Sequence, residues 1–409
     1  MLKYIPVLLL AFFMLQCTVP SRAVSKIVVE EIREMKVVRV LLDEDLHSED
    51  IKFSALLELH ADSKIIPLKN ESDKVRFLAK GNKILLKVGI NKYLVDQIDI
   101  QPFEDNNPLD YKENKYRGIF RVKSDSSKLM LINVLDIEDY LKAVIHPEMG
   151  VASKPGDFEA LKAFAVCMRN YTYMKLREAK DDFDIYPDKR DQIYSGIKAE
   201  RVYTNQAIIE TNHLVLLYNE ELAKTFYFSA CGGSTENCDN VFSQKKIGYL
   251  KGVRCGEEPF CSIAPGLYWE ENYTSAELIK LLQSAKYIAN TKYTIMLIEI
   301  NSRFESGRVN ELDIMLKSRD RKTKKIVLTG NQIRNVIKSK QTNGILRSTN
   351  FELEPEYKGR YLSGLKIKGK GNGHGVGFCQ WGAIGQSRQG RKFDEILYFY
   401  FPNTSLREM

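Results

Sequence analysis

Hydrophobic and polar residues alternate in short runs along the first part of the chain. The runs KVVRVLL, KILLKV, YLVDQIDI and KLMLINVL lie between residues 26 and 133, and polar turns such as AKGNK and SDSSK separate them. Alternation with a period of two over such short runs is typical of strands that bury one face. The pattern therefore predicts a β-rich N-terminal region over residues 26–133.

The spacing of apolar residues becomes helical after Ile137. Within Asp157–Ala179, apolar residues recur at the spacing of one helix face, and Asp157 is expected to cap the N-terminus of this helix. Arg169 falls at the edge of the apolar stripe. Because arginine is rarely buried without a partner, one interpretation is that its stem packs on the core while its charged head reaches water.

The rest of the chain mixes the two patterns. Val202–Phe228 is expected to form strands. Between about Tyr268 and Phe351, a helix TSAELIKLLQSA precedes the strands TIMLIEI, VNELDIML and KKIVLTG, and a helix GNQIRNVIKS follows. A glycine-rich stretch then leads into a last helical segment, FDEILYFYFP. The sequence thus predicts an α+β protein, with a β-rich N-terminal region followed by a mixed α+β part.

The first 23 residues have the pattern of an export signal. Lys3 precedes an apolar run from Tyr4 to Leu15, which is short for a membrane span. Ser21-Arg22-Ala23 fits ordinary cleavage after Ala23. Leu15-Gln16-Cys17 resembles a lipoprotein box, although Gln is unusual before the cysteine, and an uncleaved anchor is the third alternative. We expect an exported protein, periplasmic, in the cell envelope or membrane-anchored, that touches the membrane only through this segment.

The chain of 409 residues is basic, with a formal net charge of +8. Removal of residues 1–23 takes away Lys3 and Arg22 and no acidic residue, which lowers the net charge from +8 to +6. A positive surface attracts polyanions. Because no arginine-rich tail or RNA-binding signature is present, we exclude nucleic acid and expect cell-wall carboxylates or a membrane surface instead. A basic surface that only keeps the protein soluble is the simplest alternative.

One carboxylic acid, Glu148, lies in the sequence HPEMG at His146–Gly150, ahead of the helix expected from Asp157. Cleavage of a glycosidic bond needs a proton on the leaving oxygen, and a carboxylic acid kept neutral by a partly apolar pocket supplies one. Most glycosidases use two carboxylates. Lytic transglycosylases manage with one, which then removes a proton from the sugar's own C6 hydroxyl to give a 1,6-anhydro product. The alternative is a glutamate at a helix entry, favoured by the helix dipole.

The stretch GNGHGVGFCQWGA at Gly371–Ala383 gathers glycines around His374. Glycines let a backbone approach a flat polar polymer closely, and Gln380 and Trp381 add a polar and an aromatic side chain. The alternative is that the glycines only form tight turns. For His374, a hydrogen bond to substrate and a buried structural hydrogen bond are both open. The stretch is not a phosphate loop, because no Lys-Ser or Lys-Thr pair follows it.

Four of the seven cysteines lie close together in sequence. They are Cys231, Cys238, Cys255 and Cys261. In an exported protein, clustered cysteines indicate disulfides. Four thiolates that hold zinc are the alternative, although no short C-x-x-C pair is present, and free thiols are the third. We therefore expect no cofactor, with zinc at these four cysteines as the alternative.

Three segments, in the same order along the chain, resemble the signature of the SpoIID/LytB family, which contains sporulation stage II protein D and its relatives. YLKAVIHPEM followed by EALKAFAVCMRNYT is similar to the family's core, and FYFSACGGSTENCDNVF to its Ser-x-x-Gly-Gly-x-Thr-Glu segment. GHGVGFCQWGAIGQ is similar to its C-terminal box. Shorter similarities occur at Tyr116–Gly118, Ser306–Val309 and Leu328–Arg334, so that the resemblance spans most of residues 115–403.

The resemblance implies a lytic transglycosylase that cleaves the MurNAc-GlcNAc bond of peptidoglycan glycan strands whose stem peptides an amidase has removed. The implied partners are these strands and a cell-wall amidase, in sporulation or cell division. Glu148 matches the family's catalytic glutamate. Arg169 matches an arginine of its helix, where it would hold a substrate oxygen or lower the pKa of Glu148. The implied substrate-binding residues are Ser229, Gly232, Gly233, Thr235, His374, Gln380 and Trp381.

The chain departs from the family pattern in ways that bear on metal binding and catalysis. Phe228 stands where many relatives have histidine, which counts against the zinc site of some relatives. Phe378, Cys379 and Trp381 stand where Met, Ser and Tyr are more common, and Trp381 keeps a surface on which a sugar ring can stack. The alternative function is a glycan-binding or amidase-activating module without turnover.

We expect four parts along the chain. Residues 1–23 form the signal peptide or lipoprotein signal, and residues 26–133 the β-rich region. Residues 134–267 form a core with the catalytic glutamate and the Cys-Gly-Gly segment. Residues 268–409 form a second α+β part that contains the glycine-rich box.

Overall fold

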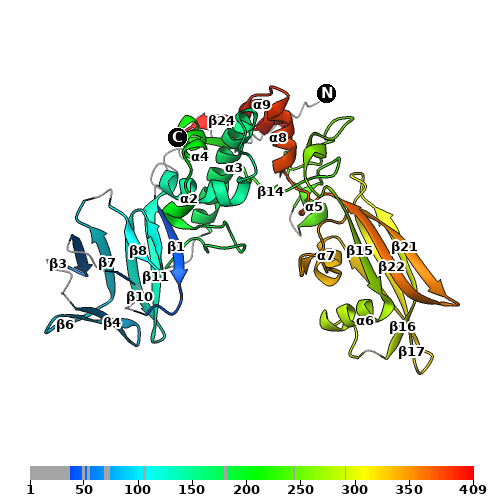
Figure 1. Ribbon diagram of the computed structural model, residues 1–409, viewed down its shortest axis with the longest axis horizontal. Helices are drawn as coiled ribbons and strands as arrows, with labels where there is room; N and C mark the ends of the chain where they lie inside the picture. The colour runs from blue at the N-terminus through cyan, green and yellow to red at the C-terminus, as the bar shows by residue number, and fades with distance from the viewer. Residues whose placement is uncertain are drawn as a thin grey trace, which may run out of the picture.

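The computed structural model describes residues 37–47, 51–52, 56–68, 74–104, 107–178, 182–242, 245–290 and 292–409. The expected export signal at residues 1–23 lies outside these ranges. Figure 1 shows strands gathered at both ends of an elongated molecule, with most of the helices between them. No helix in the described part of the chain is long and apolar enough to cross a membrane.

The N-terminal part is built from antiparallel strands, as predicted. A six-stranded sheet has the order β1 (Val37–Asp43), β11 (Lys128–Asp136), β10 (Ile119–Asp125), β7 (Gln97–Pro102), β2 (Leu57–Ala61) and β3 (Lys64–Leu68). A smaller sheet contains β4 (Val75–Lys80), β5 (Lys83–Val88) and β6 (Asn91–Val95), and β8 (Leu109–Tyr111) pairs with β9 (Asn114–Tyr116). Buried and partly exposed residues alternate along β7, which is the pattern that predicted this region.

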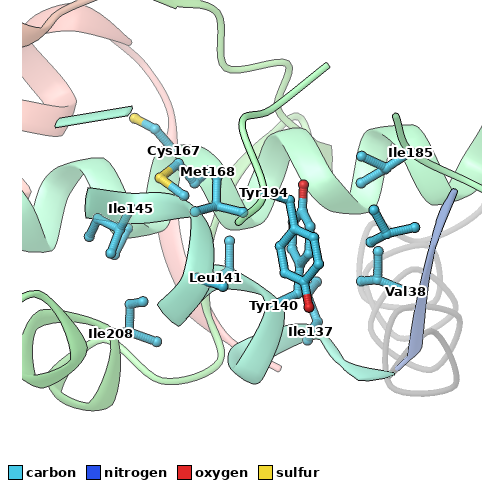
Figure 2. Close-up of a cluster of buried hydrophobic side chains, with 14 of the residues drawn as sticks. Val38, Ile137, Tyr140, Leu141, Ile145, Cys167, Met168, Ile185, Tyr194 and Ile208 are labelled. Atoms are coloured by element: carbon cyan, nitrogen blue, oxygen red, sulfur yellow. The ribbon is translucent and has the colours of Figure 1, made fainter. Parts of the chain in front are cut away.

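A helical layer follows the sheet directly. Its helices are α2 (Ile137–Met149), α3 (Phe158–Arg177) and α4 (Val202–Glu210). The last residue of β11, Asp136, caps α2, because its side chain accepts a hydrogen bond of 2.8 Å from the backbone N–H of Glu138. Figure 2 shows apolar side chains of α2, α3 and α4 packed together, with Tyr194 among them. The sheet thus leads without a linker into α2, whose last turn carries Glu148.

Two details of this layer correct the sequence-based expectations. Val202–Glu210 is a helix and not a strand. The segment has too few apolar residues for the helical period of 3.6 to be distinguished from the strand period of two, so the sequence pattern did not reveal the helix. Asp157 precedes α3 but makes no side-chain cap to that helix. Its carboxylate instead accepts hydrogen bonds from Arg388 and from the backbone N–H of Lys154.

The second α+β unit has its own hydrophobic core, distinct from that of the helical layer. One sheet has the order β15 (Tyr268–Thr274), β22 (Tyr361–Lys370) and β21 (Phe351–Lys358), and another the order β16 (Tyr293–Arg303), β17 (Val309–Ser318) and β18 (Thr323–Thr329). Two helices, α6 (Ser275–Ser284) and α7 (Asn331–Val336), and a short pair, β19 (Lys338–Ser339) with β20 (Gly344–Ile345), complete it. The helices and strands expected here are confirmed.

The chain then returns to the first core. The strand β23 (Phe378–Cys379) pairs in parallel with β14 (Tyr227–Phe228). Helices α8 (Gln380–Arg388) and α9 (Phe393–Tyr400) follow, and β24 (Ser405–Glu408) joins β12 (Leu214–Tyr218), next to β13 (Glu221–Leu222). A short helix α5 (Cys238–Val241) lies between β14 and the second unit in sequence.

This return corrects the expected fourth part at residues 268–409. Phe378, Ile384 and Phe401 are buried in the same core as α3, whereas the core of the second unit ends at Ile367. The glycine-rich box therefore belongs with the helical layer that holds Glu148, and residues 268–370 form an insertion between two pieces of that layer.

Candidate active site

Glu148 is the second-last residue of α2, so it lies at the C-terminal end of a helix and not at an entry. Its side chain is half-buried. The carboxylate oxygen Oε1 accepts a hydrogen bond of 2.9 Å from the backbone N–H of Ile193. No lysine or arginine among the described residues forms an ion pair with Glu148. This position therefore excludes the alternative raised from the sequence, in which the dipole at a helix N-terminus stabilises the charge of Glu148.

The surroundings of Glu148 favour its neutral form. Burial raises the pKa of the Glu148 carboxyl above 4.5, against the opposing effect of hydrogen bonds from Ile193 and from the Tyr227 side chain. The negative end of the helix dipole also disfavours a carboxylate at this end of α2. A carboxyl group that holds its proton more tightly than an exposed glutamate is better suited to protonate a leaving oxygen.

Gln380 joins the glycine-rich box to Glu148. It is the first residue of α8, and its Nε2 donates a hydrogen bond of 3.0 Å to the backbone carbonyl of Glu148. The two residues are 232 positions apart in the chain. The carbonyl of Glu148 lies in the last turn of α2, where no intrahelical N–H is available to it. Gln380 thus satisfies this carbonyl and fixes the helix end from which the Glu148 side chain extends.

The Ser-x-x-Gly-Gly segment lies beside the box. Residues Tyr227 and Phe228 pair with Phe378 and Cys379, and the backbone N–H of Trp381 donates a hydrogen bond of 3.0 Å to the carbonyl of Ser229. Both Ser229 and Trp381 are half-buried, and the Trp381 ring packs against the core. The structure therefore brings Ser229, Gln380 and Trp381 to the same place as Glu148.

His374 uses both ring nitrogens inside the protein. Nε2 lies 2.9 Å from the carbonyl of Tyr227, and the backbone N–H of Val376 donates to Nδ1 at 3.1 Å. These contacts require a neutral ring with the proton on Nε2. Burial, with smaller contributions from two arginines, lowers the pKa of His374 to about 3. Of the two sequence expectations, the structure agrees with the buried structural hydrogen bond.

The remaining predicted substrate-binding residues form the turn that supports the site. Thr235 is buried, and its hydroxyl accepts a hydrogen bond of 2.7 Å from the backbone N–H of Val253. Gly232 has φ of +73°, and a side chain there would come within 3.1 Å of the backbone of Gly371. The expectation that Thr235 and Gly232 face substrate is thus corrected. Gly233, with φ of +123°, also serves the turn.

Comparison with known proteins agrees with this arrangement. Residues 125–218, which contain α2 and α3, match the family described as Stage II sporulation protein, SpoIID. An uncharacterised protein of Brachyspira hyodysenteriae is 30% identical over 304 residues, which are 73% of this chain and 74% of that protein. Stage II sporulation protein D of Bacillus subtilis is 24% identical over 290 residues, 67% of this chain and 75% of the relative.

The chain belongs to the SpoIID family. A protein of Bacillus subtilis named Amidase enhancer is also similar, with 26% identity over 293 residues that cover 65% of this chain and 40% of the relative. Residues 264–377 match a domain of unknown function, DUF8618. That match nearly coincides with the insertion at residues 268–370, so the SpoIID core and the inserted unit are separate in sequence relationships as well as in packing.

The structure places Arg169, the second expected catalytic residue of the SpoIID core, away from Glu148. Arg169 is fully buried, and its Nε and Nη2 each donate a hydrogen bond of 2.7 Å to a carboxylate oxygen of Glu138. Its Nη1 donates to the carbonyl of Leu214 at 3.0 Å. All these partners are internal, so Arg169 neither reaches water nor touches Glu148. Its expected place in the site is corrected, because Glu138 at the other end of α2 provides the partner that a buried arginine needs.

The cysteines also differ from expectation. All six described cysteines are free thiols, so the expected disulfides are not formed among them. The sulfur atoms of Cys231, Cys261 and Cys379 lie within 4.8 Å of one another, and Cys255 Sγ lies 3.0 Å from Cys231 Sγ. Cys238 is buried elsewhere, at the start of α5. Among the described residues, the three sulfurs that lie close enough together to share one ion are therefore those of Cys231, Cys261 and Cys379.

Sequence reasoning missed two residues that shape the site. Tyr227 approaches Glu148 from β14, and its position just before the Ser-x-x-Gly-Gly segment was the one signal that could have indicated it. Ile193 acts through its backbone N–H, which any residue would offer, so no side-chain pattern could have pointed to it. Gln192, next to it, is buried and accepts hydrogen bonds from Tyr140 and Thr172.

Proposed function

We propose that this protein is an exported lytic transglycosylase that cleaves the MurNAc-GlcNAc bond of peptidoglycan glycan strands lacking stem peptides. Membership of the SpoIID family and relatives named Stage II sporulation protein D and Amidase enhancer support a role at the cell wall. The pattern of residues 1–23 supports export. The name of the second relative supports a cell-wall amidase as the partner that prepares the substrate.

The observation that carries the proposal is the single half-buried carboxyl of Glu148, held without a cationic partner among the described residues and with its helix end fixed by Gln380. In the first step, protonated Glu148 donates its proton to the glycosidic oxygen as the bond from that oxygen to C1 of MurNAc breaks. In the second step, the C6 hydroxyl oxygen of the same sugar bonds to C1, and its proton returns to the Glu148 carboxylate. No water is consumed, and the acid is regenerated for the next turnover.

Other residues act on Glu148 rather than on the sugar. The Ile193 N–H and the Tyr227 side chain stabilise the carboxylate that forms after the first step, so the pKa is raised but the ionised state stays accessible. Trp381 and Ser229 are only half-buried and lie next to Gln380, which suits contact with a sugar ring.

The test is mass spectrometry of peptide-free glycan strands after incubation with the purified protein. We expect 1,6-anhydro ends with the wild-type chain and with Glu305→Gln, which changes an exposed glutamate in the same way. Glu148→Gln should give none above background. If the wild-type chain binds strands but leaves no anhydro ends, the non-catalytic alternative, a glycan-binding or amidase-activating module, replaces the proposal. Hydrolytic products with reducing ends would also contradict it.

A further inference from the structure

The sheet of β15, β22 and β21 in the inserted unit (Figure 1) carries an open groove of about 530 Å³. Its lining comes from all three strands and from Asn350, the residue before β21. None of the residues assigned above to the site around Glu148 is part of this lining. We call it the sheet groove. The polar side chains and the one exposed aromatic ring among its lining residues are Tyr268, Glu270, Asn350, Glu352, Lys368 and Lys370.

The strand register divides these six residues into two rows on one face of the sheet. Tyr268 is paired with Lys370, and the backbone N–H of Lys370 donates a hydrogen bond of 2.9 Å to the carbonyl of Asn350. Because cross-strand neighbours point to the same face, Tyr268, Lys370 and Asn350 form the first row. The second row, two residues away along each strand, consists of Glu270, Lys368 and Glu352.

Charges of the second row have partners inside the protein. Glu352 pairs with Arg303 at 2.7 Å, and Lys368 pairs with Glu354 at 2.7 Å. A charged ligand at these two side chains would have to compete with the existing ion pairs. The second row is therefore the weaker place to bind a charge.

The first row has no such partners. Tyr268 is 75% exposed and makes no ring contact or hydrogen bond with another described residue. Lys370 is exposed and forms no ion pair within the described part of the chain. Asn350 is only 6% exposed, yet its side-chain amide makes no hydrogen bond to any residue that the structure describes. A largely buried amide without a partner is costly, so a ligand that forms hydrogen bonds with it is favoured.

An exposed aromatic ring, an ammonium and an amide in one row match the groups of a single sugar. An aromatic ring offers an apolar surface to the face of a sugar, a primary amide both donates to and accepts from an N-acetyl group, and an ammonium binds a carboxylate. MurNAc carries an N-acetyl group and a lactyl ether, and removal of the stem peptide leaves the lactyl group with a free carboxylate. GlcNAc has no such carboxylate, so Lys370 would distinguish the two sugars of the strand.

The sheet groove lies close to the segment that carries Ser229. Ala230, the next residue, exchanges two backbone hydrogen bonds of 2.9 and 2.8 Å with Asn372. Lys370 is two residues before Asn372 in the chain, and two peptide units span at most about 7.6 Å. A glycan strand of several sugars that contacts Ser229 is therefore long enough to reach the groove.

We propose that the sheet groove is a binding subsite for one MurNAc residue of a peptide-free glycan strand, away from the bond that is cleaved. The sugar ring stacks on Tyr268, its N-acetyl group forms hydrogen bonds with the amide of Asn350, and its lactyl carboxylate pairs with Lys370. The identity of the sugar rests on the proposed function. The inserted unit then holds a strand through a carboxylate that exists only after the stem peptide has been removed.

The first test measures binding to the full chain with Glu148→Gln, so that turnover does not consume the ligand. The probes are peptide-free glycan strands and GlcNAc oligomers, which lack the lactyl group. Tyr268→Ala should weaken binding of the strands about tenfold. Tyr357→Ala is the control, because it removes an exposed tyrosine elsewhere on the same sheet and should leave the affinity unchanged. Normal affinity in Tyr268→Ala, or a chain that binds neither probe, would overturn the proposal.

The second test concerns the lactyl carboxylate. At low salt, Lys370→Gln should weaken binding of peptide-free strands about threefold to fivefold and leave binding of GlcNAc oligomers unchanged. Lys358→Gln is the control, because it removes the same charge from an exposed position of β21. Equal losses in the two lysine variants, or a loss in Lys370→Gln that extends to GlcNAc oligomers, would overturn the contact between Lys370 and the carboxylate.

The third test replaces the unpartnered amide. Asn350→Asp keeps the size of the side chain, removes the amide donor and adds a negative charge close to the ligand carboxylate, so strands should bind at least about tenfold more weakly. Unchanged affinity would overturn the role of Asn350. Where this variant does not fold, the variants of Tyr268 and Lys370, both exposed residues, decide.

Formation of anhydro ends separates this proposal from the proposed function. Strands that bind with the expected dependence on Tyr268 and Lys370 but yield no anhydro ends would overturn the proposed function and leave the subsite standing. Cleavage with the same KM in the wild-type chain and in Tyr268→Ala would overturn the subsite and leave the proposed function standing.

Discussion

The two ends of helix α2 carry glutamates in opposite environments. At the N-terminal end, both carboxylate oxygens of Glu138 are paired with the buried Arg169, and the helix dipole favours a negative charge. At the C-terminal end, Glu148 has one backbone N–H, a nearby tyrosine and no cation among the described residues. Ten positions of helix separate the two, which corresponds to about 15 Å.

Under the proposed function, one helix would provide a structural anion at one end and an acid at the other. The pair of Glu138 and Arg169 joins α2 to α3 and, through the carbonyl of Leu214, to β12. Glu148 receives no such compensation, and burial raises its pKa. A mutation at the first end should therefore alter folding, and a mutation at the second end should alter chemistry.

The largest expected effect is on turnover in Glu148→Gln. The amide keeps the size of the side chain but has no acidic proton, and loss of general acid catalysis typically costs about 10²–10⁴-fold in rate. The melting temperature should stay close to that of the wild-type chain. The measurement is the initial rate of anhydro-end formation on peptide-free strands. Activity within tenfold of wild type would remove Glu148 as the catalyst.

Arg169→Ala should have the opposite effect: it should lower the stability of the fold rather than remove turnover directly. It removes the buried guanidinium and leaves the mostly buried carboxylate of Glu138 without its arginine. Breaking a buried ion pair in this way costs about 3–5 kcal/mol of unfolding free energy. Denaturant unfolding measures the change. Arg190→Ala is the control, because Arg190 pairs with Asp188 at the surface and should change stability little. A stable Arg169→Ala chain that has lost its activity would place Arg169 in the catalytic site after all.

The half-buried ring of His374 should make stability depend on pH. Its pKa is lowered to about 3 in the folded chain from 6.5, so between these values the unfolded chain binds a proton that the folded chain does not. The stabilisation is thus complete above pH 6.5 and is lost as the pH falls toward 3. At pH 5 the loss is about 2 kcal/mol. In His374→Gln, the change in unfolding free energy between pH 7.5 and pH 5 should be smaller by this amount. An unchanged difference would mean that His374 is accessible to water.

Gln380→Ala should have the smallest effect. It removes the hydrogen bond to the carbonyl of Glu148, and such a bond contributes about 0.5–1.5 kcal/mol. We expect turnover to fall several-fold while the melting temperature drops only slightly. Gln389→Ala, at an exposed position after the same helix, should change neither. If Gln380→Ala melts many degrees lower while the protein that remains folded cleaves strands at the normal rate, Gln380 stabilises the fold and does not position Glu148.

The sequence alone was sufficient to predict those features whose pattern lies within a short stretch of the chain. Periodicity predicted α3, the N-terminal strands and the strands and helices of the second unit, because each pattern lies within one element. The motif with Glu148 and the resemblance to the SpoIID family indicated a candidate acid and a glycine-rich box, and the structure places the two in contact through Gln380.

The sequence was insufficient where a partner lies far away along the chain. Arg169 finds Glu138 31 positions earlier, and Cys379 joins Cys231 from 148 positions away. No periodicity reports such contacts, since they arise only when the chain returns to the first core after the insertion. The boundary at residue 268 was predictable from the change of pattern, but the return at residue 371 was not, because glycine-rich turns carry no periodicity.

The most direct test of the account is the pH dependence of kcat/KM for cleavage of peptide-free strands by the wild-type chain, measured where circular dichroism shows it folded. Because the first step needs protonated Glu148, the rate should be highest at low pH and fall about tenfold per unit above a midpoint higher than 4.5, the ordinary value for a glutamate. A rate that rises with pH through this range, or one independent of pH, would contradict the assignment of Glu148 as the acid.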